Sequence, residues 1–208
     1  PPAAPAVPPP PRPLLPPTPL TPLPPPAALI AATACRYPGA AASLTSAWAG
    51  MASPRAPDLQ APTPWPRWDD EAAYSPTPVP GCLVSYTRHA AWTAGLAGWD
   101  AAAFRVGAAE AAATDPAARV LLELVAGLSG PAAPSLPSAA GVYVGAMYHE
   151  YVDAAAGGTA GGGGGLPSHA FVGSGPPYLV GRVAFHFGLG GPCVSTDTAC
   201  SASLVATH

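Results

Sequence analysis

Apolar segments with strand-like and helix-like spacing follow one another along most of the chain. Leu29–Ala34 is a short apolar run before the Tyr37–Gly39 break, and it predicts a buried strand that leads into a turn. Gly141–Met147 (GVYVGAM) is rich in β-branched and aromatic residues and predicts a second strand. Cys193–Asp197 predicts a third strand, followed by a tight corner and a helix that opens at Ser201–Leu204.

The clearest helical pattern follows Asp115–Pro116, which suits an N-cap and a first-turn proline. In the segment AARVLLELVAGL, helical spacing places five apolar residues on one face, namely Val120, Leu121, Leu124, Val125 and Leu128. Arg182–Phe187 indicates either another helix or a strand turn. Strands that alternate with helices are typical of an α/β fold.

Proline and glycine mark the segments without such patterns. Residues 1–28 hold 15 prolines and predict an extended, disordered linker. Because PxxP spacing recurs there, a ligand for a proline-binding module is the alternative. Residues 131–138 and 154–165 predict loops. The glycine run 161–165 is not a phosphate-binding loop, since such a loop needs a following lysine and the chain has none.

The charge pattern excludes several classes of partner. Only 9% of the residues are charged, the net charge is −3, and the arginines are scattered singly, so nucleic-acid binding has no electrostatic basis. No apolar run reaches the roughly 18 residues that span a bilayer, and the N-terminus does not resemble a secretory signal. The four cysteines are too few for a disulfide framework, so we expect reduced thiols in a cytoplasmic protein.

The segment GPCVSTDTACSASLVATH (Gly191–His208) contains the main candidate for chemistry, Cys200. It places a thiol where an extended segment turns into a helix of small residues, near the positive end of the helix dipole. The dipole and the unpaired amides favour the thiolate, so we expect the pKa to fall from roughly 8.5 toward neutrality or below. The Cys200 amide is a candidate donor to an oxyanion. The alternative is a buried, inert cysteine.

This segment resembles the active-site signature of β-ketoacyl synthases, GPSxxxDTACSSSLVAxH, with the cysteine at Cys200. Upstream segments resemble the family in the same order and at similar spacing. They are IAATACRYPGA, WPRWDDEAAY, AGWDAAAFRVGAAEAAATDPAARVLLELV, GVYVGAMYHEY and VGSGPPYLVGRVAFHFGLGGP. The combination of ACRYPG and TDTACSAS is most similar to modular polyketide synthases and animal-type fatty acid synthases.

The resemblance implies that residues 29–208 are the N-terminal half of a ketosynthase domain of a modular, type I polyketide synthase, with a thiolase-like α/β fold. It implies that Cys200 takes an acyl group from the phosphopantetheine arm of an acyl carrier protein domain. A malonyl-type unit then loses CO₂, and the resulting carbanion attacks the acyl-cysteine. The implied substrates are acyl and malonyl thioesters, the full-length protein is expected to be a homodimer, and no cofactor is bound directly.

Two histidines assist this condensation in the family, in HGTGT-like and GHxxxAAG-like motifs of its C-terminal half, and neither motif occurs here. The chain lacks an initiator Met and stops at His208, which indicates a piece of a longer polypeptide. We therefore expect the isolated chain to be inactive. The family's Pro–Arg pair before Glu110 is also lost, its tGN asparagine is Ser174, and one serine of its CSSS run is Ala202. These departures leave open a degenerate, non-catalytic copy that dimerises or docks a carrier protein.

The other polar candidates have structural interpretations. Cys193 and the five histidines share no metal-ligand spacing, so no metal site is predicted, and Cys193 is expected to be a buried strand residue. Asp197 is expected to anchor the corner through backbone amides, because a carboxylate that acted beside the thiol would raise its pKa. Arg182 is a candidate partner for Asp197.

Overall fold

The computed structural model describes ten parts of the chain, residues 30–39, 41, 43–53, 60–64, 70–77, 79–82, 84–128, 136–147, 150–151 and 168–208. The chain divides into two units, Pro1–Ala31 and Ala32–His208. The predicted linker, residues 1–28, lies outside the described residues, as does the glycine run. All the helices and strands that follow belong to the second unit.

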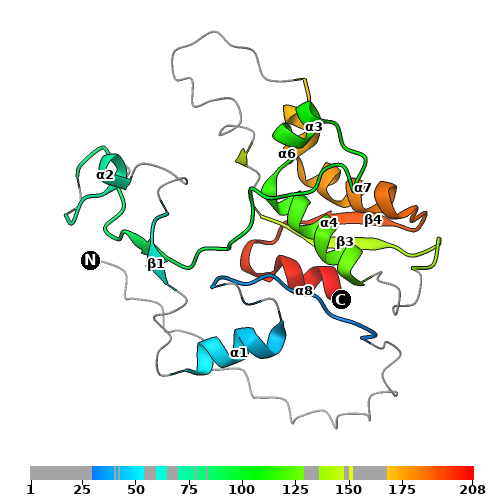
Figure 1. Cartoon of the computed structure of the whole chain (residues 1–208), viewed down its shortest axis with the longest axis horizontal. Helices are drawn as coiled ribbons and strands as arrows, with labels where there is room; N and C mark the ends of the chain where they lie inside the picture. The colour runs from blue at the N-terminus through cyan, green and yellow to red at the C-terminus, as the bar shows by residue number, and fades with distance from the viewer. Residues whose placement is uncertain are drawn as a thin grey trace, which may run out of the picture. The chain divides into compact units, whose positions relative to one another are not determined.

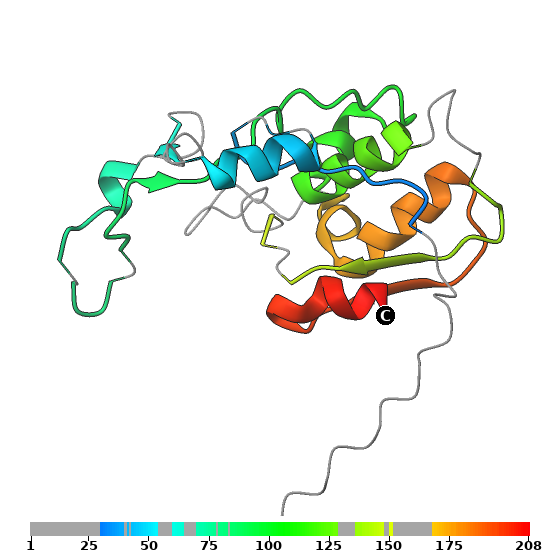
Figure 2. The ribbon, with the colours of Figure 1, turned by 90° about the horizontal axis from the view of Figure 1, so that it is seen from below.

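The centre of this unit is a pair of parallel strands between helices. Strands β3 (Val142–Gly145) and β4 (Cys193–Thr196) pair with Val142 opposite Cys193 and Gly145 opposite Thr196. Helix α7 (Pro176–Phe187) covers one face of the pair and packs against helix α4 (Pro116–Leu128), while helix α8 (Ala202–Thr207) covers the other face (Figures 1 and 2). The arrangement is therefore three-layered, with helices on both faces as parallel strands require.

The core lies between α4, α7 and the strand pair. It contains Leu122, which is fully buried, with Val142, Val180, Val183 and Ala184. Seven partly buried apolar residues pack against this cluster, namely Trp99, Phe104, Leu121, Val125, Val144, Phe187 and Leu189. The strands predicted near residues 141–147 and 193–197 and the predicted α/β class are thus confirmed, and Val142 and Val144 of β3 pack in the core.

Helix α4 begins as predicted but is oriented differently. The Asp115 carboxylate accepts a hydrogen bond from the Ala117 amide at 2.7 Å, which is the expected N-cap. The fully buried residues of the helix are Ala118 and Leu122, which are not among the five apolar residues placed on one face from the sequence. Leu121 and Val125 pack against the core, while Val120 and Leu124 are not part of that cluster and line, together with Leu121, a cavity of about 350 Å³. Besides the five residues named from the sequence, Ala118 and Leu122 are apolar as well, so periodicity alone could not select the face that meets α7.

Residues 182–187, for which helix and strand turn were both open, belong to α7. The helix starts at Pro176, where a missing N–H costs nothing, and ends at Gly188, whose φ of 64° is the left-handed conformation that favours glycine. Arg182 on this helix forms an ion pair with Glu110 of helix α3 (Ala108–Ala113). The pair connects the α7 layer to the segment before α4.

The remaining elements are short. Helix α1 (Leu44–Ala52) starts with a capping box in which Ser43 and Ser46 bond each other's backbone amides. The other elements are β1 (Ala61–Pro62), α2 (Asp70–Ala73), β2 (His89–Ala90), α6 (Ala170–Ser174) and the 3₁₀ turn η2 (Ala199–Ser201), and β1 pairs with β2 in antiparallel register.

The predicted buried strand at Leu29–Ala34 was wrong. Leu29 is not among the described residues, and Ile30–Ala34 is exposed and has no regular structure, with 82% of Ile30 accessible. No described segment pairs with it, and a short apolar run becomes a strand only when a neighbour completes its hydrogen bonds. The turn that follows is confirmed, since Gly39 has a φ of 68°.

Candidate active site

Cys200 lies at the corner between β4 and α8. The strand ends at Thr196, Asp197 and Thr198 follow, and Cys200 is the middle residue of η2, directly before α8. Its side chain is exposed. The predicted order of strand, tight corner and helix is therefore confirmed, with the first helical turn in the tighter 3₁₀ form.

The corner is sharp because Ala199 adopts a left-handed backbone conformation, with φ at 52°. For a residue with a Cβ, this conformation costs roughly 1–2 kcal/mol, so surrounding contacts have to hold it. The Asp197 carboxylate accepts a hydrogen bond from the Ala199 amide at 3.1 Å, and the Ser201 hydroxyl donates to the Thr198 carbonyl at 2.9 Å. Asp197 thus anchors the corner through a backbone amide, as predicted.

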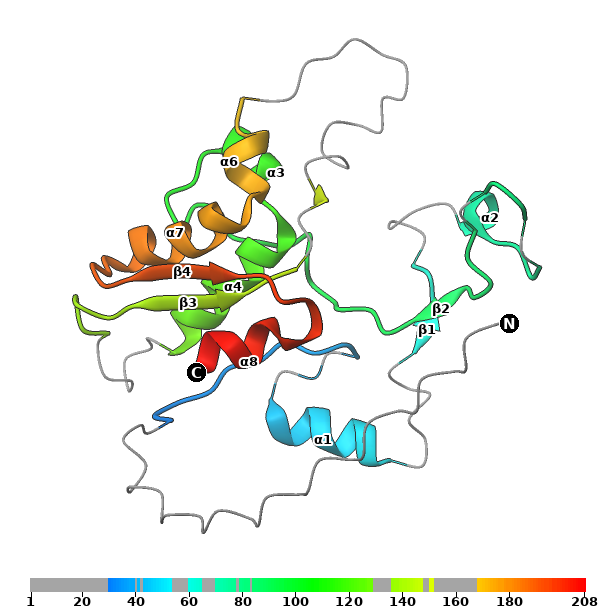
Figure 3. The same cartoon turned by 180° about the vertical axis from the view of Figure 1, so that it is seen from behind.

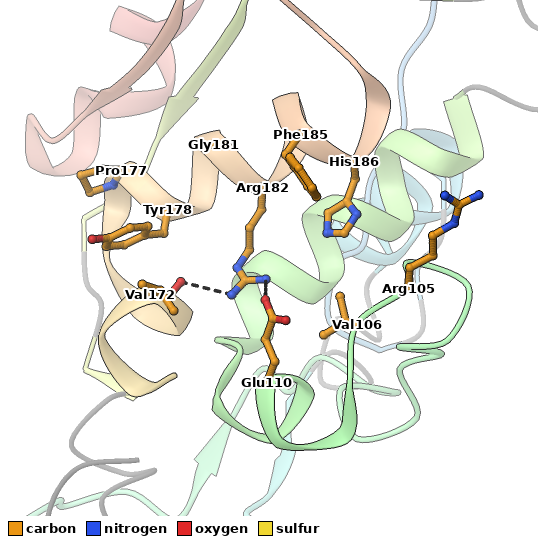
Figure 4. Close-up of a pocket in the computed structure, with 10 residues that line it drawn as sticks. All are labelled: Arg105, Val106, Glu110, Val172, Pro177, Tyr178, Gly181, Arg182, Phe185 and His186. Carbon is orange, nitrogen blue, oxygen red and sulfur yellow. Dashed lines mark hydrogen bonds and ion pairs between the residues drawn. The ribbon is translucent and has the colours of Figure 1, made fainter. Parts of the chain in front are cut away.

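The predicted partner of Asp197 was wrong. Arg182 lies on α7, and its guanidinium is 2.7 Å from the Glu110 carboxylate and donates at 3.2 Å to the Val172 carbonyl (Figure 4). Only 11% of the Arg182 side chain is exposed, against 34% for Glu110. Arg182 lies on α7, on the face of the strand pair opposite to α8. Its closeness to β4 in the sequence therefore does not identify its partner.

None of the four cysteines, all of which are among the described residues, forms a disulfide. Cys193 is in β4 as predicted but is exposed, so its expected burial was wrong. It sits at the start of β4, opposite Val142 of β3. Among the described residues, no group of three or more Cys, His, Asp or Glu side chains is arranged to hold a metal ion.

A cavity of about 310 Å³ lies around Arg182 and is separate from Cys200 (Figure 4). Charged and aromatic side chains of α3, α7 and the preceding loop line it, including Glu110, Arg105, Tyr178, Phe185 and His186. None of the four cavities described here (those around Arg182, Leu124, Cys82 and Ser174) includes Cys200 in its lining. The Cys200 side chain is exposed.

His186, which lines the cavity around Arg182, makes the stability of the protein depend on pH. Burial lowers the pKa of the His186 imidazole from its ordinary value of 6.5, and the neighbouring Arg182 lowers it further, while Glu110 acts in the opposite direction. As the pH falls, the unfolded chain therefore takes up the proton first, near pH 6.5, and the free energy of unfolding decreases until the folded pKa is passed. Above pH 6.5 both states are neutral and the contribution is constant.

We expect the variant H186F to lose part of the decrease in melting temperature between pH 7 and pH 5. Phenylalanine keeps the edge-to-face contacts that the imidazole makes with Phe104 and Phe185, whose ring centroids lie 5.9 and 5.5 Å away. Melting curves at half-unit pH steps provide the measurement. An unchanged pH slope in H186F would show that His186 does not titrate differently in the folded state.

Sequence reasoning missed the Glu110–Arg182 pair, although it noted that Glu110 is kept where the preceding Pro–Arg pair is lost.

Of the motif WPRWDDEAAY, residues 65–69 lie outside the described part of the chain, and so does His149. The other four histidines are described, and none of them contacts Cys200 through a hydrogen bond given by the structure. Within the described residues, no helix has the length and apolar character needed to cross a membrane.

Comparison with known proteins agrees with these features. Residues 28–208 match the model of the β-ketoacyl synthase N-terminal domain. The chain is 40% identical over 186 residues to polyketide synthase GfsA of Streptomyces halstedii and 37% identical over 186 residues to the pikromycin polyketide synthase component PikAII of Streptomyces venezuelae. Each match covers 86% of this chain, but only 2% and 5% of these relatives.

Solved structures show the same fold. An oxazolomycin ketosynthase domain of Streptomyces albus JA3453 superimposes with a TM-score of 0.67 and 31% identity, over 83% of this chain and 29% of that one. A ketosynthase from module 6 of the bacillaene synthase of Bacillus subtilis 168 gives 0.61 and 25%, over 83% and 27%. The chain belongs to the β-ketoacyl synthase family, and it corresponds to the N-terminal, thiolase-like part of the ketosynthase domains of polyketide synthases.

Proposed function

We propose that Cys200 is the acyl-accepting nucleophile of this ketosynthase. The observation that carries the proposal is the position of the exposed Cys200, directly after the strained Ala199 and one residue before the start of α8. Strained backbone next to a reactive side chain is a frequent property of catalytic sites, because it presents the side chain away from the neighbouring structure. The residues on either side, Ala199 and Ser201, are small and leave the sulfur accessible to a thioester.

In the proposed reaction, the Cys200 thiolate attacks the carbonyl carbon of an acyl thioester. A new carbon–sulfur bond forms to Cys200, the carbon–sulfur bond of the thioester breaks, and the carrier's thiol leaves with the proton lost by Cys200. A malonyl thioester then loses CO₂, its carbanion attacks the acyl-cysteine carbonyl, and the Cys200 thiolate is released. The condensation step belongs to the full-length protein, because the chain contains neither histidine motif that the family uses for it.

We propose an acyl carrier protein domain as the partner, since its phosphopantetheine arm presents acyl and malonyl groups as thioesters. The full-length protein is proposed to be a cytoplasmic homodimer. Exposed apolar side chains on α7 and β4 support a second copy as a partner, since Phe185 is 83% and Val194 is 38% accessible. The proposal requires no directly bound cofactor or metal.

Incubation of the protein with an acyl N-acetylcysteamine thioester tests the nucleophile directly. We expect intact-mass analysis to show one added acyl group, and peptide mapping to place it on Cys200. The variant C200A should lose the adduct completely, whereas C82A should keep it, because Cys82 is also exposed but lies in a separate loop. An acyl group distributed equally over Cys82, Cys193 and Cys200 would contradict a specific nucleophile.

The alternative, a degenerate copy that acts as a scaffold, makes the opposite prediction in the same experiment. Such a copy would bind a carrier protein or a second chain without acyl transfer to Cys200. The departures at Ser174 and Ala202 lie in family motifs but leave the corner itself intact, since Ala202 is 4% exposed and well packed. This packing favours the catalytic interpretation.

A further inference from the structure

The first residue of α8 rests on a matched pair of residues in the two strands. Gly145 is the last residue of β3 and Thr196 the last of β4, and the two face each other in register. Both contact Ala202, which is 4% exposed and follows Cys200 by two residues. Figures 2 and 3 show α8 lying directly against the strand pair.

At Gly145 the helix comes too close for any side chain. A Cβ on this residue would lie 2.5 Å from the Ser203 nitrogen and 2.6 Å from the Ala202 oxygen, and it would also contact the Ala202 carbonyl carbon. These are backbone atoms of α8, so they cannot move away without displacement of the helix start. Gly145 is therefore required for the close approach of α8 to β3.

At Thr196 the helix is tethered. The Thr196 hydroxyl donates a hydrogen bond of 3.2 Å to the Ala202 carbonyl, in a partly buried position. The Thr196 carbonyl accepts a bond of 3.0 Å from the Ala146 amide, which holds this residue to the chain that continues from β3. The chain therefore leaves the strand at Thr196, forms the corner, and at Ala202 is hydrogen-bonded back to the Thr196 side chain.

We propose that Gly145 and Thr196 position Cys200, an inference that rests on the proposed role of Cys200 as the nucleophile. The five residues between Thr196 and Ala202 form a short loop that is closed at its base by the Thr196 hydroxyl. Cys200 and the strained Ala199 both lie in this loop. With the base closed, the orientation of the thiol relative to the amides of η2 and α8 is set; with the base open, Ala199 can relax and the thiol loses that environment.

The test is the rate of iodoacetamide alkylation at each cysteine of the full chain, measured by peptide mass spectrometry from pH 6 to pH 9. Cys200 is exposed, so the reagent reaches the thiol in every variant and the rate reports on the surroundings of the sulfur. We expect T196V to slow the labelling of Cys200 at pH 7 about five- to tenfold and to move its pH profile toward that of Cys82.

T196S retains the hydroxyl and should remain within about twofold of the unmodified chain, and G145A should slow Cys200 as T196V does. Two cysteines in the same sample are internal controls. The rate at the exposed Cys82 should stay constant in every variant, and a higher rate at the half-buried Cys35 would indicate opening of the structure away from the corner.

The outcomes separate the two levels of the proposal. If Cys200 of the unmodified chain reacts no faster than Cys82 at pH 7, the activated nucleophile itself is refuted. If Cys200 is fast in the unmodified chain and equally fast in T196V and G145A, only the positioning role is refuted. If T196V slows alkylation of Cys200 but also speeds alkylation of Cys35, the positioning role is refuted as well. The Thr196 hydroxyl would then stabilise the structure as a whole and not the corner in particular.

Discussion

Replacement of Leu122 by alanine is expected to lower the free energy of unfolding by about 3 kcal/mol, a typical value for a buried leucine. Leu122 is the only described large apolar side chain with no exposed surface, and it stands at the centre of the cluster with Val142, Val180 and Val183. The cavity left by the lost atoms lies where α4, α7 and β3 meet. The surrounding side chains belong to three elements, so they cannot close it by a single shift.

The matched control is L204A, in which a leucine of α8 with 73% of its surface exposed is truncated. We expect this change to stay within about 0.5 kcal/mol. Urea unfolding followed by tryptophan fluorescence is suitable for both, since Trp99 packs against the core cluster. Equal midpoints for L122A and L204A would mean that the core is not built around Leu122.

Replacement of Gly173 by alanine is expected to destabilise the protein by roughly 3 kcal/mol, at the upper end of the range for overpacking. Gly173 lies in α6, where its missing side chain allows the end of α3 to pack against it. A Cβ would lie 2.7 Å from the Ala113 carbonyl carbon, and it would also contact the Ala113 carbonyl oxygen. The Gly173 carbonyl accepts a hydrogen bond of 2.9 Å from the Asp115 amide, so a shift of α6 also disturbs the start of α4.

Gly127 offers a control of opposite sign. It lies in α4, is exposed, and would have no atom within 4 Å of an added Cβ. Because glycine is a poor helix former, G127A should raise the free energy of unfolding by about 0.5–1 kcal/mol. The urea midpoints of G173A and G127A are then compared. If G173A unfolds at or above the midpoint of G127A, the close contact between α3 and α6 does not exist in solution.

Features that depend on nearby residues could be predicted from the sequence. The N-cap at Asp115, the strands at 142–145 and 193–196, and the corner before Cys200 all follow from local patterns, and each is observed. The strand predicted for the apolar run from Leu29 does not form, whereas β3 and β4 form because they pair with each other. A strand needs a partner, and local composition does not say whether one is present.

The sequence by itself determined the family, the candidate nucleophile and the order of strands and helices around it, because motif spacing and capping act over a few residues. The tertiary structure alone decided which side of α4 is buried, that Arg182 pairs with Glu110, 72 residues away, and that Gly145 and Thr196 both meet Ala202. These contacts join elements far apart in the chain, and only the packing of the three layers brings them together.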